Sequence, residues 1–269
     1  MGGEKMKKDF ELQGFSVHSE YVRRVENAKY AVLLIHGILG TPNFFRDFVK
    51  EIPDSFSVYN ILLDGHGGSV DDFSATSMAK WKAQIRGLLD GLYTKYEKII
   101  LVGHSMGTLF SIDAAASRPD KIMAAYLFAS PLKVFVKPVS AKYSLKLIFN
   151  KESDDPMVTS AKDAYGIAPD RRLWKYAPWV PRFIELLSEI RKTRKHIPLI
   201  ATPTYVFQSA KDELVSVRSC EFFEGNPHIH LTVLENSTHQ CYSKEDKETL
   251  VRAFRRLFRH ECSLEKQNQ

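Results

Sequence analysis

The chain has 269 residues, of which 44% are hydrophobic and 26% charged, and its net charge is +6. This composition fits a globular protein with a large core. No apolar run approaches the about 20 residues that a membrane-spanning helix needs, and the first residues lack the apolar stretch of a secretory signal.

The three cysteines, Cys220, Cys241 and Cys262, are odd in number and far apart. Such a set fits a reducing compartment better than a disulfide framework, so we expect a cytoplasmic protein. Neither a C-x-x-C nor an H-E-x-x-H pattern occurs, and we expect no metal and no cofactor.

Six apolar segments predict buried strands, and segments with helical spacing lie between them. The predicted strands are residues 30–35, 56–63, 98–102, 122–129, 204–207 and 229–234. Thr41 is predicted to be the N-cap of a helix, and Pro42 its first residue. A terminal helix is predicted, with Leu250, Phe254 and Phe258 on the face that packs against the core. The alternation predicts an α/β fold, with a mostly parallel central sheet and helices on both faces.

The alternation stops between residues 132 and 197, where Phe183 to Ile190 predicts a helix but no strong strand appears. We interpret this segment as an insertion in a core formed by residues 1–131 and 198–269. Between residues 131 and 197 there are 14 Lys and Arg against 7 Asp and Glu, so the basic excess lies here. The excess is interpreted either as a solvated surface or as a field that attracts anionic substrates or lipid interfaces. No nucleic-acid-binding module accompanies it, and we expect no nucleic-acid partner.

A G-x-S-x-G pattern, Gly103 to Gly107, joins the strand 98–102 to the helix predicted from Thr108 to Ser117. A serine between a strand and a helix in this pattern indicates a nucleophile elbow, with the Ser105 hydroxyl at the carboxyl edge of the sheet. The two glycines are expected because side chains beside so sharp a turn would collide with the neighbouring strand or helix.

A serine nucleophile needs a base and a group that orients the base. His239, in the polar turn after the strand 229–234, is the predicted base. Asp212, in the loop after the strand 204–207, is the predicted orienting acid, and Glu213 is the alternative. The order Ser, Asp, His is that of α/β-hydrolases.

Two backbone amides are expected to form an oxyanion hole. One is Met106 N–H, at the start of the helix after the elbow. The other is assigned to Ile38, with Leu39 in reserve, in the loop that follows the first buried strand.

These motifs resemble the α/β-hydrolase superfamily, and in particular the bacterial carboxylesterases and monoacylglycerol lipases. The matching segments are His36 to Pro42, Gly65 to Gly67, Gly103 to Gly107, Asp212 and His239. The resemblance spans about residues 30 to 260, and it implies that residues 132–197 form a helical cap over the active site. Thr108, where many relatives have Gly, and Ile38, where an aromatic residue is common, depart from the pattern.

The expected function is serine hydrolysis of carboxylic esters with short to medium acyl chains, including monoacylglycerol, through an acyl-enzyme. Small-molecule esters are then the partners, and the basic cap could contact a lipid interface transiently. Apolar residues of the cap are candidates for an acyl pocket: Phe135, Tyr143, Leu147, Phe149, Tyr165, Trp174, Trp179 and Phe183. The alternatives are a proline-iminopeptidase-like peptidase, which the basic cap disfavours, and a non-catalytic ligand-binding protein. The sequence leaves the oligomeric state open.

Overall fold

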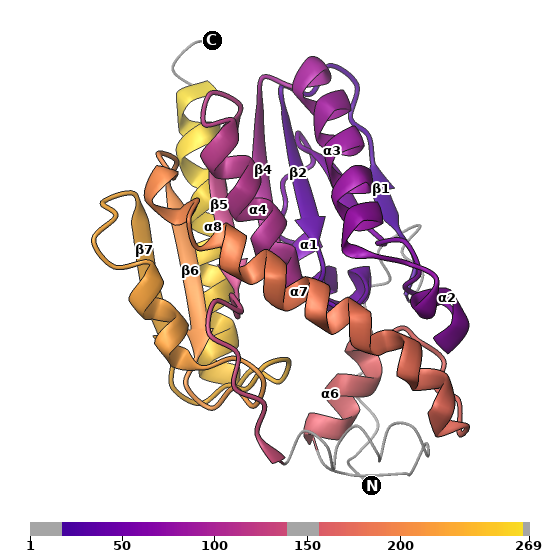
Figure 1. Ribbon diagram of the computed structural model, residues 1–269. Helices are drawn as coiled ribbons and strands as arrows, with labels where there is room; N and C mark the ends of the chain where they lie inside the picture. The colour runs from indigo at the N-terminus through magenta and orange to yellow at the C-terminus, as the bar shows by residue number, and fades with distance from the viewer. Residues whose placement is uncertain (1–17, 139–155, 266–269) are drawn as a thin grey trace, which may run out of the picture.

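The computed structural model describes residues 18–138 and 156–265 and contains a seven-stranded sheet (Figure 1). The strand order is β1-β3-β2-β4-β5-β6-β7; β1 pairs antiparallel with β3, and all other neighbours are parallel. The strands are β1 (Tyr21–Arg23), β2 (Tyr30–Ile35), β3 (Ser57–Ile61), β4 (Lys98–His104), β5 (Ile122–Phe128), β6 (Thr204–Ser209) and β7 (Ile229–Leu234).

All six predicted strands are present, and the predicted mostly parallel central sheet is confirmed. Two strands extend beyond their predicted ends: β4 reaches His104 and β6 reaches Ser209. The antiparallel edge strand β1 was not predicted, because three residues are too few to show a period.

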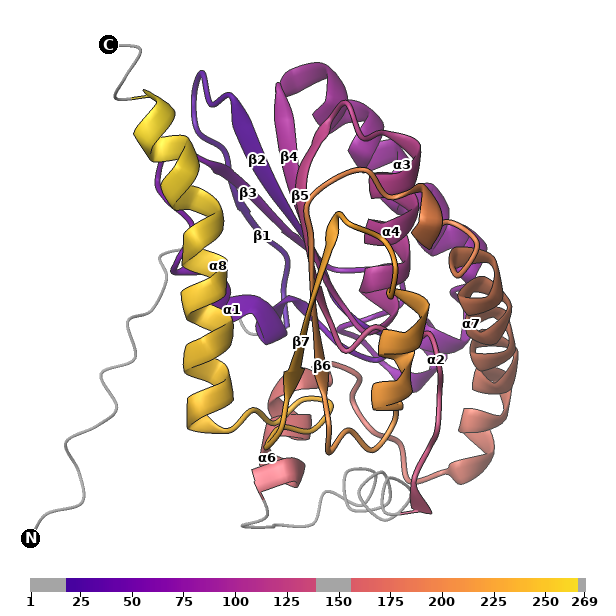
Figure 2. The same ribbon diagram turned by 90° about the vertical axis from the view of Figure 1, so that its left-hand side faces the viewer.

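Helices cover both faces of the sheet, as Figure 2 shows. The larger helices on one face are α3 (Met78–Lys95) and α4 (Met106–Ser117). Their apolar side chains join those of alternate strand residues such as Leu33 and Leu101 in one core. On the opposite face, α1 (Arg46–Val49) and α8 (Lys244–Glu265) cover a second core that includes Val102 and Phe128. The side-chain alternation of the strands therefore feeds two separate cores.

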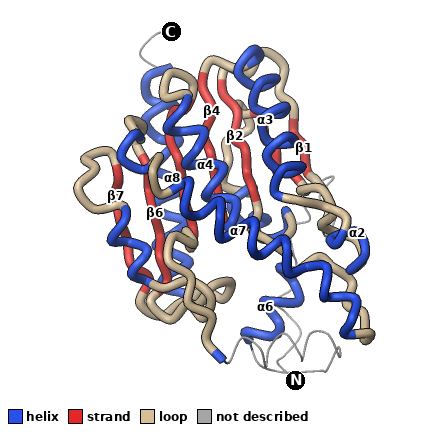
Figure 3. Tube along the Cα trace, viewed as in Figure 1, coloured by secondary structure: helices blue, strands red, loops and turns tan. Residues whose placement is uncertain are grey.

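The described part of residues 132–197 consists of helices and loops with isolated bridges, as Figure 3 shows. The helix predicted from Phe183 to Ile190 is α7. The division into core and insertion, with the boundaries given above, stays a prediction. The helical elements here are α6 (Pro156–Ala164), the 3₁₀ helix η2 (Leu173–Trp179), α7 (Val180–Thr193) and the start of η3 (Ile197–Leu199).

The remaining helical elements are short and lie in loops at the ends of strands. They are η1 (Pro42–Phe45), α2 (Val70–Ser74) and η4 (Val217–Phe222). Of all the helices in the described ranges, none combines the length and apolarity needed to cross a membrane.

Candidate active site

Ser105 forms a sharp turn between β4 and α4. Its backbone has φ 49° and ψ −121°, a conformation that is costly for a residue with a side chain. A Cβ on Gly107 would lie 1.9 Å from the Ile35 carbonyl oxygen, and one on Gly103 would lie 2.8 Å from the Thr108 nitrogen. Only glycine fits at both positions, which is the steric reason expected for the two glycines of an elbow.

The loop after β2 passes directly beside this turn. A Cβ on Gly37 would lie 2.8 Å from Ser105 Cβ, so the missing side chain of Gly37 lets the loop approach the serine. The approach brings the backbone of residues 36–40 to the edge of the sheet where Ser105 lies.

His239 and Asp212 meet at the same edge, from the loops after β7 and β6. His239 Nδ1 lies 2.8 Å from Asp212 Oδ2, and both side chains are almost completely buried. Asp212 Oδ1 accepts hydrogen bonds of 2.8 Å from the amides of Leu214 and Val215. The carboxylate is thus fixed on both oxygens, and His239 Nε2 is left for another partner.

Glu213, the alternative acid, makes a different contact. Its Oε2 accepts a hydrogen bond of 3.2 Å from the backbone amide of His239, not from the ring. The structure therefore places Asp212 against the imidazole and Glu213 against the main chain of the same residue.

The surroundings of His239 favour its charged form. Burial of the ring by itself lowers the pKa, but the charge and hydrogen bond of Asp212 and the charge of Glu213 together raise the pKa above the ordinary value. An imidazole in this setting is a stronger base than a free one.

His104 links the turn at Ser105 to the loop that carries His239. Its Nε2–H donates to the His239 carbonyl oxygen over 3.2 Å, and the two ring centroids lie 5.0 Å apart. The Phe44 ring also stacks on His104, with ring centroids 3.8 Å apart. Burial and the neighbouring His239 hold the pKa of His104 well below its ordinary value, so the ring is neutral.

Within the described part of the chain, the Ser105 hydroxyl makes no side-chain hydrogen bond.

Two more neutral histidines fix the loop after β2. His36 Nε2 accepts from the Leu63 amide at 3.0 Å, and His66 Nε2 accepts from the Leu39 amide at 3.2 Å. Burial lowers the pKa of both rings, to about 4 for His66. Because the Leu39 amide is used in this way, it is not available to an oxyanion.

The amides of Ile38 and Met106 make no hydrogen bond to any other described residue. Met106 is the first residue of α4, where a helix leaves its N–H groups unpaired. Ile38 and Met106 are therefore the better candidates for the two oxyanion donors, and Leu39 is the weaker one.

Tyr165, after α6, reaches the same site from the predicted insertion. Burial, followed by the charges of Glu213 and Asp212, raises its pKa. Gly40 and Tyr165 form an isolated antiparallel bridge, which ties this segment to the loop after β2. From the sequence, Tyr165 was only one of several aromatic candidates for the acyl pocket. A bridge between distant loops leaves no local sequence pattern that would have placed Tyr165 at the site.

Two other candidates for the acyl pocket are mostly exposed to solvent. Trp174 is 72% exposed and Phe135 is 61% exposed. Trp179 instead packs against Phe73, with ring centroids 4.7 Å apart. Three further candidates, Tyr143, Leu147 and Phe149, lie outside the described residues. Among the residues that the structure describes, no group of three or more His, Cys, Asp and Glu could hold a metal ion.

Comparison with known proteins places this fold in a family. The profile of the family described as serine aminopeptidase, S33, matches residues 26–246. The thermostable monoacylglycerol lipase of Bacillus sp. (strain H-257) is 22% identical over 84% of this chain and 89% of its own length.

Solved structures show the same architecture. The lipolytic enzymes LipS and LipT, which are derived from metagenomes, provide a structure that covers 90% of this chain and 97% of its own, with a TM-score of 0.68 and 19% identity. The monoacylglycerol lipase of Paleococcus ferrophilus covers 86% of this chain and 94% of its own, with a TM-score of 0.60 and 18% identity. The chain therefore belongs to the serine aminopeptidase S33 family and is a lipase- and esterase-like hydrolase with the α/β-hydrolase fold.

Proposed function

We propose that the protein hydrolyses carboxylic esters with a Ser105–His239–Asp212 triad. The observation that carries the proposal is the buried hydrogen bond between His239 and Asp212, in a loop that His104 holds beside the strained turn at Ser105. A serine in such a turn, a base and an orienting carboxylate form the arrangement used for acyl transfer.

In the first half of the proposed reaction, Ser105 Oγ attacks the ester carbonyl carbon and His239 Nε2 takes its proton. The Ile38 and Met106 amides donate to the oxyanion that forms. The bond from carbon to the alcohol oxygen then breaks, and His239 returns the proton to the leaving alcohol. In the second half, His239 activates a water molecule that attacks the acyl-enzyme, releasing the acid and restoring Ser105.

The proposed substrates are esters of short to medium acyl chains, including monoacylglycerols. The named lipase relatives support an ester of this kind. The family description supports a second candidate, an aminopeptidase. A peptidase of that type holds the free amine of its substrate with carboxylates, and the net positive charge of residues 131–197 disfavours this.

The test is hydrolysis of p-nitrophenyl esters with acyl chains from acetate to palmitate, beside monoacylglycerols and proline aminoacyl amides. We expect ester turnover that Ser105→Ala reduces on the order of 10⁴-fold or more. Ser117→Ala, a matched change at the exposed end of α4, should leave turnover unchanged. Turnover of the amides alone would favour the peptidase, and full ester turnover in Ser105→Ala would refute the triad.

A further inference from the structure

The outer face of η2 and α7 is apolar and exposed. On α7, Val180, Phe183, Ile184 and Leu187 are 56%, 39%, 61% and 44% exposed. Their spacing of three and four residues puts them on a single stripe of the helix. In η2, Leu173 and Trp174 add 51% and 72% exposed side chains. We call these six residues the outer apolar stripe.

The stripe faces away from the rest of the molecule. Figure 2 shows α7 on the outside, beyond α4 as seen from the sheet. The opposite side of α7 buries Glu189, Ile190 and Thr193, so the helix already has a core-facing side. The stripe is therefore a second apolar surface, which packing within the described structure does not use.

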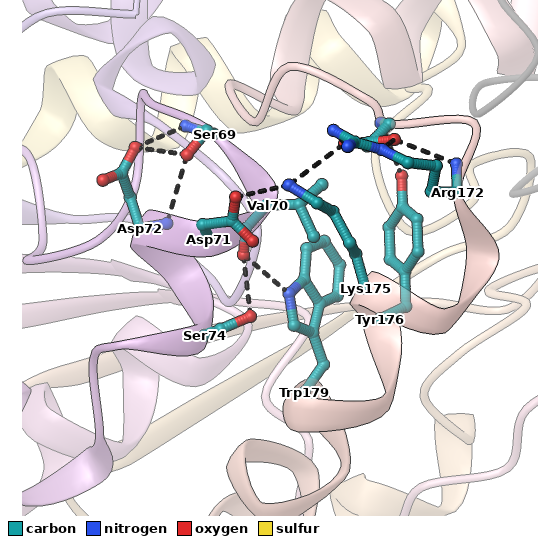
Figure 4. Close-up of polar contacts among 10 residues, drawn as sticks. Ser69, Val70, Asp71, Asp72, Ser74, Arg172, Lys175, Tyr176 and Trp179 are labelled. Atoms are coloured by element: carbon teal, nitrogen blue, oxygen red, sulfur yellow. Dashed lines mark hydrogen bonds and ion pairs between the residues drawn. The ribbon is translucent and has the colours of Figure 1, made fainter.

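The carboxylates near the outer apolar stripe, Asp71 of α2 and those of residues 170–195, are paired with cations. Figure 4 shows Lys175 of η2 in contact with Asp71 of α2, at 2.5 Å, and Trp179 Nε1–H donating to the Val70 carbonyl. Asp170 pairs with Arg172 at 2.6 Å and with Lys175 at 3.4 Å.

The other two carboxylates of residues 170–195 lie on the inner side of α7. Glu185 accepts from the Met78 amide and pairs with Arg182. Glu189 is 2% exposed and pairs with Lys82 of α3. Each carboxylate of residues 170–195 is therefore paired with a cation.

Positive charges, in contrast, flank the stripe. Arg191 lies four residues after Leu187 and seven after Ile184, and so continues the same face of α7. Lys195 follows one turn later, and Arg171 precedes η2. All three side chains are exposed and make no ion pair within the described structure. The outer surface therefore combines apolar side chains with cations at both ends.

We propose that the outer apolar stripe docks on the surface of an anionic lipid bilayer. With 14 residues, α7 is too short to span a bilayer and would lie in the interface plane. Apolar side chains enter the boundary between headgroups and acyl chains, while Arg171, Arg191 and Lys195 contact lipid phosphates. A continuous apolar stripe with cations at its two ends matches the chemistry of such a surface, in which anionic headgroups lie over apolar acyl chains. The binding is independent of the Ser105 chemistry.

The experiment measures cosedimentation of the Ser105→Ala protein with vesicles of phosphatidylcholine alone or mixed with phosphatidylglycerol. The tryptophan emission, to which the exposed Trp174 contributes together with Trp81 and Trp179, is recorded in parallel. We expect binding to the anionic vesicles, a blue shift of the emission, and weaker binding as salt rises. Ile184→Glu with Leu187→Glu should weaken binding at least tenfold, and Arg191→Gln with Lys195→Gln should reduce its salt dependence.

The matched control is Leu231→Glu with Val233→Glu, which places the same two charges at side chains that are 37% and 41% exposed on the edge strand β7. It should bind like the parent protein. Equal binding of the Ile184→Glu, Leu187→Glu variant and its parent, or no binding to anionic vesicles, would overturn the proposal. Self-association in solution that this variant abolishes would also overturn it, by assigning the stripe to a second copy of the chain.

Discussion

At the scale of single residues, four buried histidines near the candidate site have two kinds of electrostatic surroundings. His36, His66 and His104 are buried against backbone groups, and burial lowers their pKa. For His239 the carboxylates outweigh burial, so its pKa is raised. Among these four rings, the surroundings favour protonation at the one that is proposed to exchange protons.

Asp212→Asn should reduce turnover on the order of 10⁴-fold without unfolding the protein, because an amide no longer favours the Nδ1–H tautomer. Ester hydrolysis and circular dichroism measure the two parts of this expectation. Near-normal turnover would remove Asp212 from the proposed triad.

Glu213→Gln is the matched change at the neighbouring carboxylate. It should reduce turnover much less, because the hydrogen bond of the Glu213 carboxylate to His239 goes to the backbone amide. The base acts when neutral, so activity is lost as pH falls through the pKa of His239. Since the charge of Glu213 raises this pKa, the acid limb of the pH–rate profile should move to lower pH in Glu213→Gln. A shift to higher pH would contradict the assigned electrostatics.

At the scale of elements, side chains from one loop complete the hydrogen bonds of another. His66, after β3, accepts the Leu39 amide of the loop after β2, and His36 accepts the Leu63 amide in return. Thr41 Oγ1 donates to the Ala164 carbonyl at the end of α6 and makes no cap hydrogen bond in η1. Thr41 is the N-cap residue of η1 and Pro42 its first residue, as predicted, but the Thr41 side chain bonds to α6 and not to the helix that it precedes.

Acid should weaken the fold through these loops. The pKa of His66 is about 4 in the folded protein and about 6.5 in the unfolded chain. Between these values the unfolded chain binds more protons, so the free energy of unfolding falls as pH falls from about 6.5 toward about 4. In His66→Gln the amide oxygen still accepts from Leu39 but does not titrate, so this loss should be smaller.

Urea denaturation at pH 7 and pH 5 measures the difference. The control is His228→Gln, at an exposed histidine, which should behave like the parent protein. An identical loss of stability in His66→Gln and its parent would show that this histidine does not couple folding to pH.

At the scale of the whole molecule, the sheet separates two cores that are covered by different parts of the chain. The C-terminal helix α8 closes one of them. Phe254 is fully buried there, with ring centroids 5.2 Å from Tyr126 and 5.4 Å from Phe48. Tyr126 also donates to the Leu250 carbonyl at 2.7 Å, so α8 is joined to the sheet by both apolar and polar contacts.

Phe254→Ala should lower the free energy of unfolding by about 3–5 kcal/mol, because it opens a cavity in this core. Phe183→Ala, a matched change on the exposed stripe, should change it by about 0.5 kcal/mol or less. Urea denaturation compares the two variants. A large effect of Phe183→Ala would mean that the stripe is packed within the molecule.

The sequence by itself determined six of the seven strands, most of which are continuously apolar because they are buried on both faces of the sheet. It also determined the elbow at Ser105, because the sharp turn requires glycines at fixed positions beside it. Only the tertiary structure decided which carboxylate bonds to the imidazole ring of His239, and that the Ile38 amide stays unpaired while the Leu39 amide bonds to His66. It also decided that the apolar stripe of α7, with Phe183, faces outward. Periodicity shows that a helix has an apolar face, but the contacts that choose a partner for that face come from residues far away in the chain.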